Sequence, residues 1–182
     1  MSSSAELVRA VDLTVGYGRH APLLRDFHLS VSANTILALT GASGVGKSTL
    51  LYALAGMIPP REGSVDLLGA RITAFSERAR SRHRARHIGF VFQDSMLDPA
   101  RRTLDLVTET AIYAGVDRRS LLPRAHELLE ELGVGELAHR RPGQISGGQA
   151  QRIALARALA TAPRIVFADE PTANLDPASA TS

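Results

Sequence analysis

One octapeptide constrains the fold of this chain more than any other feature of its sequence. Residues 41–48 read GASGVGKS and fit the pattern GxxxxGK[ST]. Glycines let successive backbone N–H groups curve around an anion, and the positive N-terminal end of a following helix strengthens the attraction. The pattern therefore predicts a strand, a phosphate-binding loop and a helix, in that order.

The basic residue of this loop is unusual for the chain. The sequence has 21 basic residues, and Lys47 is the only lysine among them. A compact ammonium on a flexible stem reaches the outer phosphates better than a planar guanidinium, and the hydroxyl of Ser48 can bind Mg²⁺. The alternative interpretation, a glycine-rich turn that carries a lysine by accident, is much weaker because arginine fills every other basic position.

Two kinds of apolar pattern predict strands. Residues 7–31 alternate apolar and polar, which is typical of antiparallel strands with one wet face; the apolar positions are Val11, Leu13, Val15, Phe27, Leu29 and Val31. Residues 36–40 (ILALT), 88–92 (IGFVF) and 165–168 (IVFA) are continuous apolar runs. Such runs predict strands buried on both faces of a parallel sheet.

Three helices are predicted from apolar spacing and end signals. One follows Gly46 and ends near Ala55, one covers residues 121–132, and one covers residues 147–160. Residues 95–160 are mostly helical and are expected to form a lobe. Strands separated by helices predict an α/β domain, and 182 residues suit one domain of ordinary size.

Two adjacent acids follow the last apolar run. Asp169 and Glu170 come directly after residues 165–168, where ligands bind in α/β sheets. Asp169 would hold Mg²⁺, and Glu170 would face the terminal phosphate and polarise an attacking water. Alone, the pair would fit a solvated turn, but beside a phosphate loop it indicates nucleotide hydrolysis.

Composition excludes several classes of protein. The chain has no cysteine, so it has neither disulfides nor thiolate metal sites. No apolar run approaches the roughly 18 residues that cross a bilayer, and the start has no signal-peptide pattern. We expect a protein made and kept inside the cell.

Four further motifs give the chain a family resemblance. Residues 145–149 (ISGGQ) are similar to the LSGGQ signature of ABC (ATP-binding cassette) ATPases, and they precede the acidic pair as in that family. Gln93 resembles the Q-loop glutamine, residues 174–176 (NLD) resemble the D-loop, and Tyr17 matches the aromatic that stacks on adenine. The match spans nearly the whole chain. It implies a P-loop NTPase of ABC type: a mainly parallel sheet, an N-terminal antiparallel β part and a helical subdomain.

The resemblance assigns the site residues. The implied ATP-binding residues are Tyr17, Gly41, Ser43, Gly44, Gly46, Lys47, Ser48, Thr49, Ser146, Gly147, Gly148, Gln149 and Asp176. The implied ligands of Mg²⁺ are Ser48, Gln93 and Asp169, and the implied catalytic residues are Glu170, Gln93 and Lys47. Ser146 would cap a helix and leave glycine N–H groups bare for the ATP of a partner subunit.

The resemblance also implies partners and a place in the cell. We expect the ATP-binding subunit of a transporter, related to the lipoprotein-release and macrolide-export group. It would form a head-to-tail homodimer that drives separate membrane-spanning permease subunits, on the cytoplasmic face of the membrane and without nucleic acid. The family's switch histidine lies beyond Asp176, and none of the six histidines fits it by position. We therefore expect one ATPase domain over residues 1–182, incomplete at its C-terminus, unstable and poor in turnover.

Two alternatives and one charge run remain open. Instead of a transporter subunit, the chain could be a soluble ABC ATPase that acts on DNA or the ribosome. The second alternative is a nucleotide-binding module without turnover. Residues 78–87 are rich in arginine. The simpler interpretation is a solvated helix or loop; a contact with a membrane subunit or anionic lipid is the sharper one.

Overall fold

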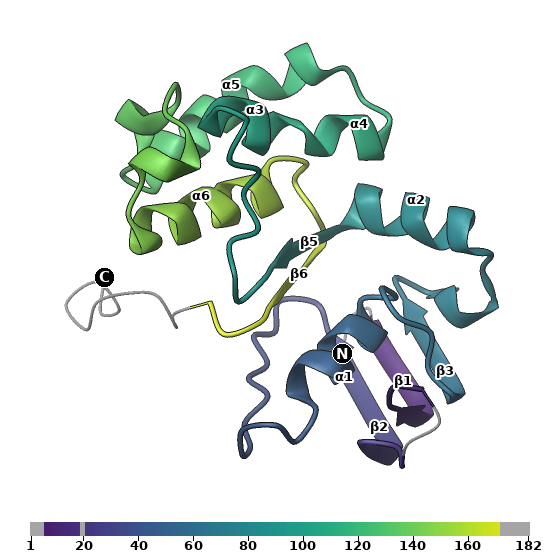
Figure 1. Cartoon of the computed structure of the whole chain (residues 1–182). Coiled ribbons are helices and arrows are strands. Elements are labelled where there is room, and N and C mark those ends of the chain that lie inside the picture. Colours follow the sequence, from purple (N-terminus) through teal and green to yellow (C-terminus); the bar gives the residue numbers. More distant parts are fainter. Residues whose placement is uncertain (1–5, 19–20, 172–182) are drawn as a thin grey trace. The chain divides into compact units, whose positions relative to one another are not determined.

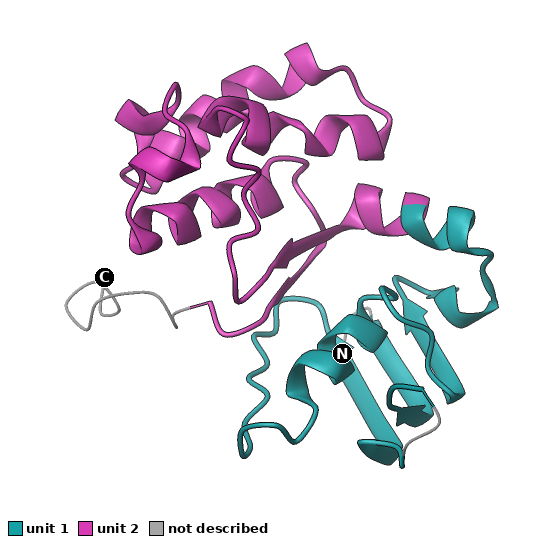
Figure 2. Ribbon diagram, viewed as in Figure 1, with its two compact units in different colours: residues 1–81 teal, residues 82–182 magenta. Residues whose placement is uncertain are grey.

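The computed structural model describes residues 6–18 and 21–171, and these divide into two compact units (Figures 1 and 2). The first unit comprises residues 1–81 and the second residues 82–182. Each unit has its own sheet and is described separately below.

The sheet of the first unit is antiparallel and four-stranded, in the order β2-β1-β3-β4. Its strands are β1 (Glu6–Val15), β2 (Leu24–Ser32), β3 (Glu62–Leu67) and β4 (Ala70–Arg71). The antiparallel prediction for residues 7–31 is confirmed. The β3–β4 hairpin was not predicted.

A bulge in β1 changes which side chains are buried. Ala10 pairs with Leu29 and Leu13 pairs with Phe27, so β1 holds one residue more than β2 between these pairs. Asp12, inside the bulge, has a φ of 51°. As a result Ala10 and Leu13 are both buried, whereas Val11, expected on the buried face, is only partly covered.

One helix packs on this sheet. Helix α1 (Lys47–Leu54) begins at the end of the phosphate loop and contacts β1. It buries Leu50, Ala53 and Leu54, and its last turn is followed by Gly56 with a φ of 69°. The predicted helix after Gly46 is confirmed. A short 3₁₀ helix, η1 (Ile72–Ala74), contacts β3.

The strand predicted at residues 36–40 is wrong. Residues 35–40 have no assigned secondary structure, and Ile36 is fully exposed while Leu37 is 50% exposed. A strand needs a neighbour that accepts and donates its ladder hydrogen bonds. No described residues pair with this run: the sheet of the first unit is formed by β1 to β4.

The second unit contains a parallel pair of strands. Strand β5 (Ile88–Val91) lies beside β6 (Ile165–Ala168), with Ile88 opposite Ile165 and Val91 opposite Ala168 (Figure 1). Both strands were predicted, but burial on both faces was wrong for β6, in which Val166 is 43% exposed and Ala168 is exposed. Because they are parallel and in register, the residues that follow them emerge at the same edge.

Most of the remaining second unit is helical. This confirms the prediction that residues 95–160 are mostly helical. The helices are α3 (Thr103–Thr108), α4 (Thr110–Ala114), α5 (Arg118–Glu131) and α6 (Gly147–Leu159), with the short turns η2 (Gly135–Leu137) and η3 (Pro142–Gln144). Helices α3, α5 and α6 contact one another around a buried core that includes Val107, Leu128, Leu129 and Ile153. Helix α5 begins three residues before the predicted start because Asp117 caps it.

Helix α6 also lies close against β5. A Cβ atom at Gly89 would stand 2.4 Å from the carbonyl oxygen of Ala158 near the end of α6. Any other residue at position 89 would push the helix away from the strand. This contact fixes α6 relative to the strand that leads to Gln93.

The arginine-rich run forms helix α2 (Glu77–His87), which has no buried residue. Its acidic end is N-terminal and its basic end C-terminal, which suits the helix dipole. Its residues are exposed or half-buried, and the side chain of Arg80 is only 13% exposed, so the helix is solvated only in part. Within the described part of the chain, no helix is both long and apolar enough to cross a bilayer.

Candidate functional site

The phosphate loop connects an extended segment to α1, and its backbone requires glycine. Gly44 has a φ of 77° and Gly46 a φ of 102°, values that other residues rarely adopt. A Cβ at Gly46 would also lie 3.1 Å from the Cβ of Leu23. Gly46 is the N-cap of α1 and makes no side-chain cap, so the first N–H groups of α1 face the loop.

The lysine of the loop folds back over it. Nζ of Lys47 donates hydrogen bonds to the carbonyl oxygens of Gly41 and Ala42, each at 2.9 Å. The ammonium is therefore held inside the curve of the loop, where a phosphate would meet both the positive charge and the N–H groups of α1. Ser43 lies in the exposed turn of the loop, and Ser48 in the first turn of α1.

The predicted adenine platform lies beside the same helix. The hydroxyl of Tyr17 accepts a hydrogen bond from Oγ1 of the buried Thr49 at 3.4 Å, while the Tyr17 residue is 54% exposed. The structure thus brings Tyr17 and Thr49 together, and it leaves the ring open to solvent.

Sequence reasoning missed a residue that holds this platform. Nη2 of Arg61 donates to the carbonyl oxygens of Tyr17 at 2.9 Å and Gly18 at 3.0 Å. The backbone N–H of Arg61 donates to the carbonyl oxygen of Thr14 at 2.9 Å. Arg61 directly precedes β3, which was not predicted, and no sequence motif marks the role of this arginine.

The second unit gathers two predicted groups at one edge of its parallel pair. Gln93 follows β5 by two residues, and Asp169 and Glu170 follow β6 directly. The backbone N–H of Asp169 donates to the carbonyl oxygen of Val91 at 2.9 Å, which extends the ladder past the strands. Gln93 and the two acids therefore emerge from adjacent chain segments.

The two acids differ in their surroundings. Asp169 is 3% exposed, whereas Glu170 is exposed and has a φ of 46°. A left-handed conformation costs a non-glycine residue about 1–2 kcal/mol and concentrates at functional sites. The turn therefore leaves Glu170 exposed to solvent while its neighbour Asp169 is covered.

The signature residues form the start of α6. Oγ of Ser146 accepts a hydrogen bond from the N–H of Gln149 at 3.3 Å, and Oε1 of Gln149 accepts one from the N–H of Ser146 at 2.9 Å. This capping box uses two of the first N–H groups. The N–H groups of Gly147 and Gly148 point out of the same turn, where helix geometry gives them no intrahelical acceptor.

The donor chemistry suits a magnesium ion. Among the described residues, no cluster of three or more His, Asp, Glu or Cys side chains could hold a metal. Mg²⁺ does not need one, because it keeps several waters and binds one or two carboxylates with substrate phosphates. Ser48 in the first unit, and Gln93 and Asp169 in the second, each carry a side-chain oxygen of the kind that this ion prefers. Asp176 lies outside the described residues.

Comparison with known proteins gives one family. The ABC transporter family matches residues 24–173. The chain is 45% identical over 161 residues to the lipoprotein-releasing system ATP-binding protein LolD 2 of Caulobacter vibrioides, covering 88% of this chain and 71% of that protein. It is 44% identical over 164 residues to the uncharacterized ABC transporter ATP-binding protein YbbA of Escherichia coli, covering 90% and 72%.

Solved structures agree with the sequence relatives. The dimeric structure of MJ0796, a bacterial ABC transporter cassette, superposes with a TM-score of 0.88 at 31% identity, covering 96% of this chain and 78% of that one. A dimeric post-hydrolysis state of MJ0796 bound to ADP and Pi gives a TM-score of 0.84, with the same identity and coverage.

Proposed function

Because the chain belongs to the ABC transporter family and is an ATP-binding subunit of that family, we propose that it hydrolyses ATP through the side chains described above. The observation that carries the proposal is the ammonium of Lys47, which lies within the glycine loop at the start of α1. Residues 1–182 would act as one ATPase domain whose helical subdomain spans about residues 95–160.

Each group has a distinct task in binding. Tyr17 would stack on the adenine, and the loop with Thr49 would surround the phosphates through backbone N–H groups. Lys47 would neutralise charge that builds up on the outer phosphates. When Mg²⁺ is bound by Ser48, Gln93 and Asp169, it supplies further positive charge at the β- and γ-phosphates.

Glu170 would carry the chemical step. Its exposed carboxylate would orient a water in line with the γ-phosphate and accept a proton from it as the water oxygen bonds to phosphorus. The bond between that phosphorus and the oxygen bridging it to the β-phosphate would break, and ADP would leave with the electron pair. The covered Asp169 would act beside it as a ligand of Mg²⁺. The difference in exposure between these neighbours supports the division of roles.

We further propose a head-to-tail homodimer. In each subunit the bare N–H groups of Gly147 and Gly148, with Ser146 and Gln149, would bind the γ-phosphate of ATP held by the other subunit, and Asp176 would lie at the same interface. Relatives solved as dimers support this arrangement. ATP-driven closure would move permease subunits at the cytoplasmic face of a membrane, in the manner of the lipoprotein-release group to which the relatives' names point.

Separate measurement of ATP binding and phosphate release tests the proposal. Lys47→Ala should lose most ATP affinity, and Lys47→Arg should also bind poorly because a planar guanidinium does not fit the curve of the loop. Arg9→Ala, on the exposed side of β1, is the matched control and should bind normally. Wild-type binding by Lys47→Ala would contradict the assignment of the phosphate loop. Binding without phosphate release by the unchanged chain would indicate a nucleotide-binding module.

A further inference from the structure

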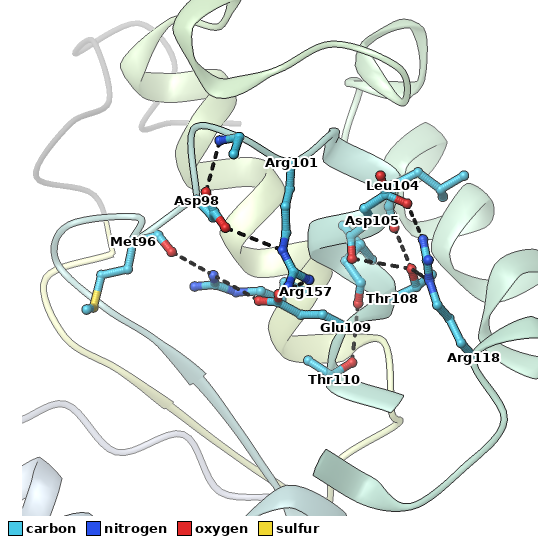
Figure 3. A network of polar contacts seen from close by, with 12 residues as sticks. Met96, Asp98, Arg101, Leu104, Asp105, Thr108, Glu109, Thr110, Arg118 and Arg157 are labelled. Atoms are coloured by element: carbon cyan, nitrogen blue, oxygen red, sulfur yellow. Dashed lines mark hydrogen bonds and ion pairs between the residues drawn. The ribbon is translucent and has the colours of Figure 1, made fainter. Parts of the chain in front are cut away.

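A largely covered arginine on α6 holds the chain segment that follows Gln93. Nη2 of Arg157 donates to the carbonyl oxygen of Ser95 at 2.9 Å. Nη1 of Arg157 donates to the carbonyl oxygen of Met96, also at 2.9 Å (Figure 3). The side chain of Arg157 is 12% exposed. Because a guanidinium presents its donors in a fixed fork, it fixes the direction of both carbonyl groups at once.

The same segment makes two further contacts, one to α6 and one within the loop before α3. Oγ of Ser95 donates to Oε1 of Gln151, a residue of α6 that is 4% exposed, at 3.1 Å. Two residues after Met96, the carboxylate of Asp98 lies 3.3 Å from Nε of Arg101. Met96 itself has a φ of 48°, a strained conformation that lasts only where surrounding contacts enforce it.

One carboxylate connects the two arginines. Oε2 of Glu109 accepts a hydrogen bond from Nη1 of Arg101 at 3.1 Å, and Oε1 lies 4.0 Å from Nη1 of Arg157. Burial lowers the pKa of Arg157, and the negative charge of Glu109 opposes that change. Glu109 therefore balances the charge of Arg157 and would keep Arg101 as a partner if Arg157 were replaced.

These contacts leave Gln93 on a short bridge with both ends fixed. At one end, Val91 is held by the β5–β6 ladder and by the N–H of Asp169. At the other end, Ser95 is held by Arg157 and Gln151. Residues 92–94 span the gap, and Gln93 is their midpoint.

From this geometry we propose that Arg157 is a positioning residue for Gln93. It ties the backbone after Gln93 to α6, the helix whose first residues are the signature. A shift of α6 is then passed to Gln93 through a rigid side chain rather than through a free loop. The inference rests on the proposed function, because it takes Gln93 as a ligand of Mg²⁺.

The central experiment is a double-mutant cycle read out by steady-state ATP hydrolysis. Arg157→Met should lower kcat on the order of tenfold, because a misplacement of about 1 Å can cost up to about a hundredfold. KM for ATP should change by less than about twofold, since the phosphate loop is untouched, and the Mg²⁺ concentration at half-maximal rate should rise. In a Gln93→Ala background, Arg157→Met should have almost no further effect on kcat.

Two variants serve as controls. Arg118 donates to Thr108 and pairs with Asp105 in the same group of helices, so both of these partners lie outside residues 93–98 (Figure 3). Arg118→Met should leave kcat and the Mg²⁺ dependence unchanged. Arg157→Lys keeps the positive charge and can donate to one carbonyl at a time, so its kcat should lie between those of Arg157→Met and the unchanged chain. This variant also keeps the proposal testable if Arg157→Met folds poorly.

Hydrogen exchange provides a readout that needs no turnover. The backbone N–H groups of residues 93–96 should exchange faster in Arg157→Met than in Arg118→Met or the unchanged chain. The proposal would be overturned if Arg157→Met lowered kcat equally in the unchanged chain and in Gln93→Ala. It would also be overturned if Arg157→Met left hydrogen exchange at residues 93–96 unchanged. Absence of hydrolysis by the unchanged chain would contradict the proposed function instead, and the exchange result would still decide the role of Arg157.

Discussion

The attachment of Tyr17 to Arg61 makes a quantitative prediction about ATP affinity. In Arg61→Met the apolar stem remains, but the hydrogen bonds from Nη2 to the carbonyl oxygens of Tyr17 and Gly18 are lost. A hydrogen bond contributes about 1 kcal/mol net, and we take about half of that for an exposed group. Together the two bonds stabilise the Tyr17 segment by about 1 kcal/mol, roughly fivefold in population.

The dissociation constant for ATP should therefore rise about two- to fivefold, because only the ordered fraction binds. Base stacking on an aromatic ring contributes about 1–3 kcal/mol to binding. Tyr17→Ala should therefore weaken ATP binding more than Arg61→Met does, and its effect sets the upper limit for Arg61→Met. Equilibrium binding of ATP is the assay. Arg71→Met, which removes an exposed pair with Asp66 in the same unit, is the matched control and should bind normally.

The double variant tests whether Arg61 acts through Tyr17. If it does, Arg61→Met adds almost nothing to Tyr17→Ala. The reasoning is refuted if Arg61→Met weakens binding equally in both backgrounds. It is also refuted if Tyr17→Ala weakens binding and Arg61→Met does not.

Two further predictions concern stability of the second unit, measured by urea unfolding. Ser146→Ala removes the cap bond to the N–H of Gln149 and should lower the free energy of unfolding by about 0.5–1 kcal/mol, whereas Ser146→Thr should stay near the unchanged chain. Ile153→Ala empties part of the helical core, where Ile153 is 0% exposed, and should cost about 2–5 kcal/mol. Ile112→Ala, at a residue 66% exposed, should stay within about 0.5 kcal/mol, and a comparable loss there would contradict the description of the core.

Local patterns predicted the elements whose signals are contained in their own residues. The strand at residues 165–168 and the helix after Ser146 could be read from an apolar run and from a cap with its glycines. The phosphate loop could be read from spacing alone, because positive φ angles restrict positions such as Gly44 and Gly46 to glycine.

Features that depend on distant partners could not be predicted. Residues 36–40 have the composition of a buried strand, but composition does not supply a ladder partner. The bulge at Asp12 leaves Val11 only partly covered, although the alternation in the sequence continues through it. Arg61 and Arg157 act on backbone carbonyls 44 and 61 residues away, which no local motif encodes.

The most direct test is to measure ATP binding, phosphate release and molecular size in Glu170→Gln. Glutamine keeps the shape of the side chain but cannot accept the proton of the attacking water. The account predicts ATP affinity near that of the unchanged chain, almost no phosphate release, and a dimer that persists with ATP and Mg²⁺. A monomeric Glu170→Gln chain that hydrolyses ATP at the normal rate would contradict it.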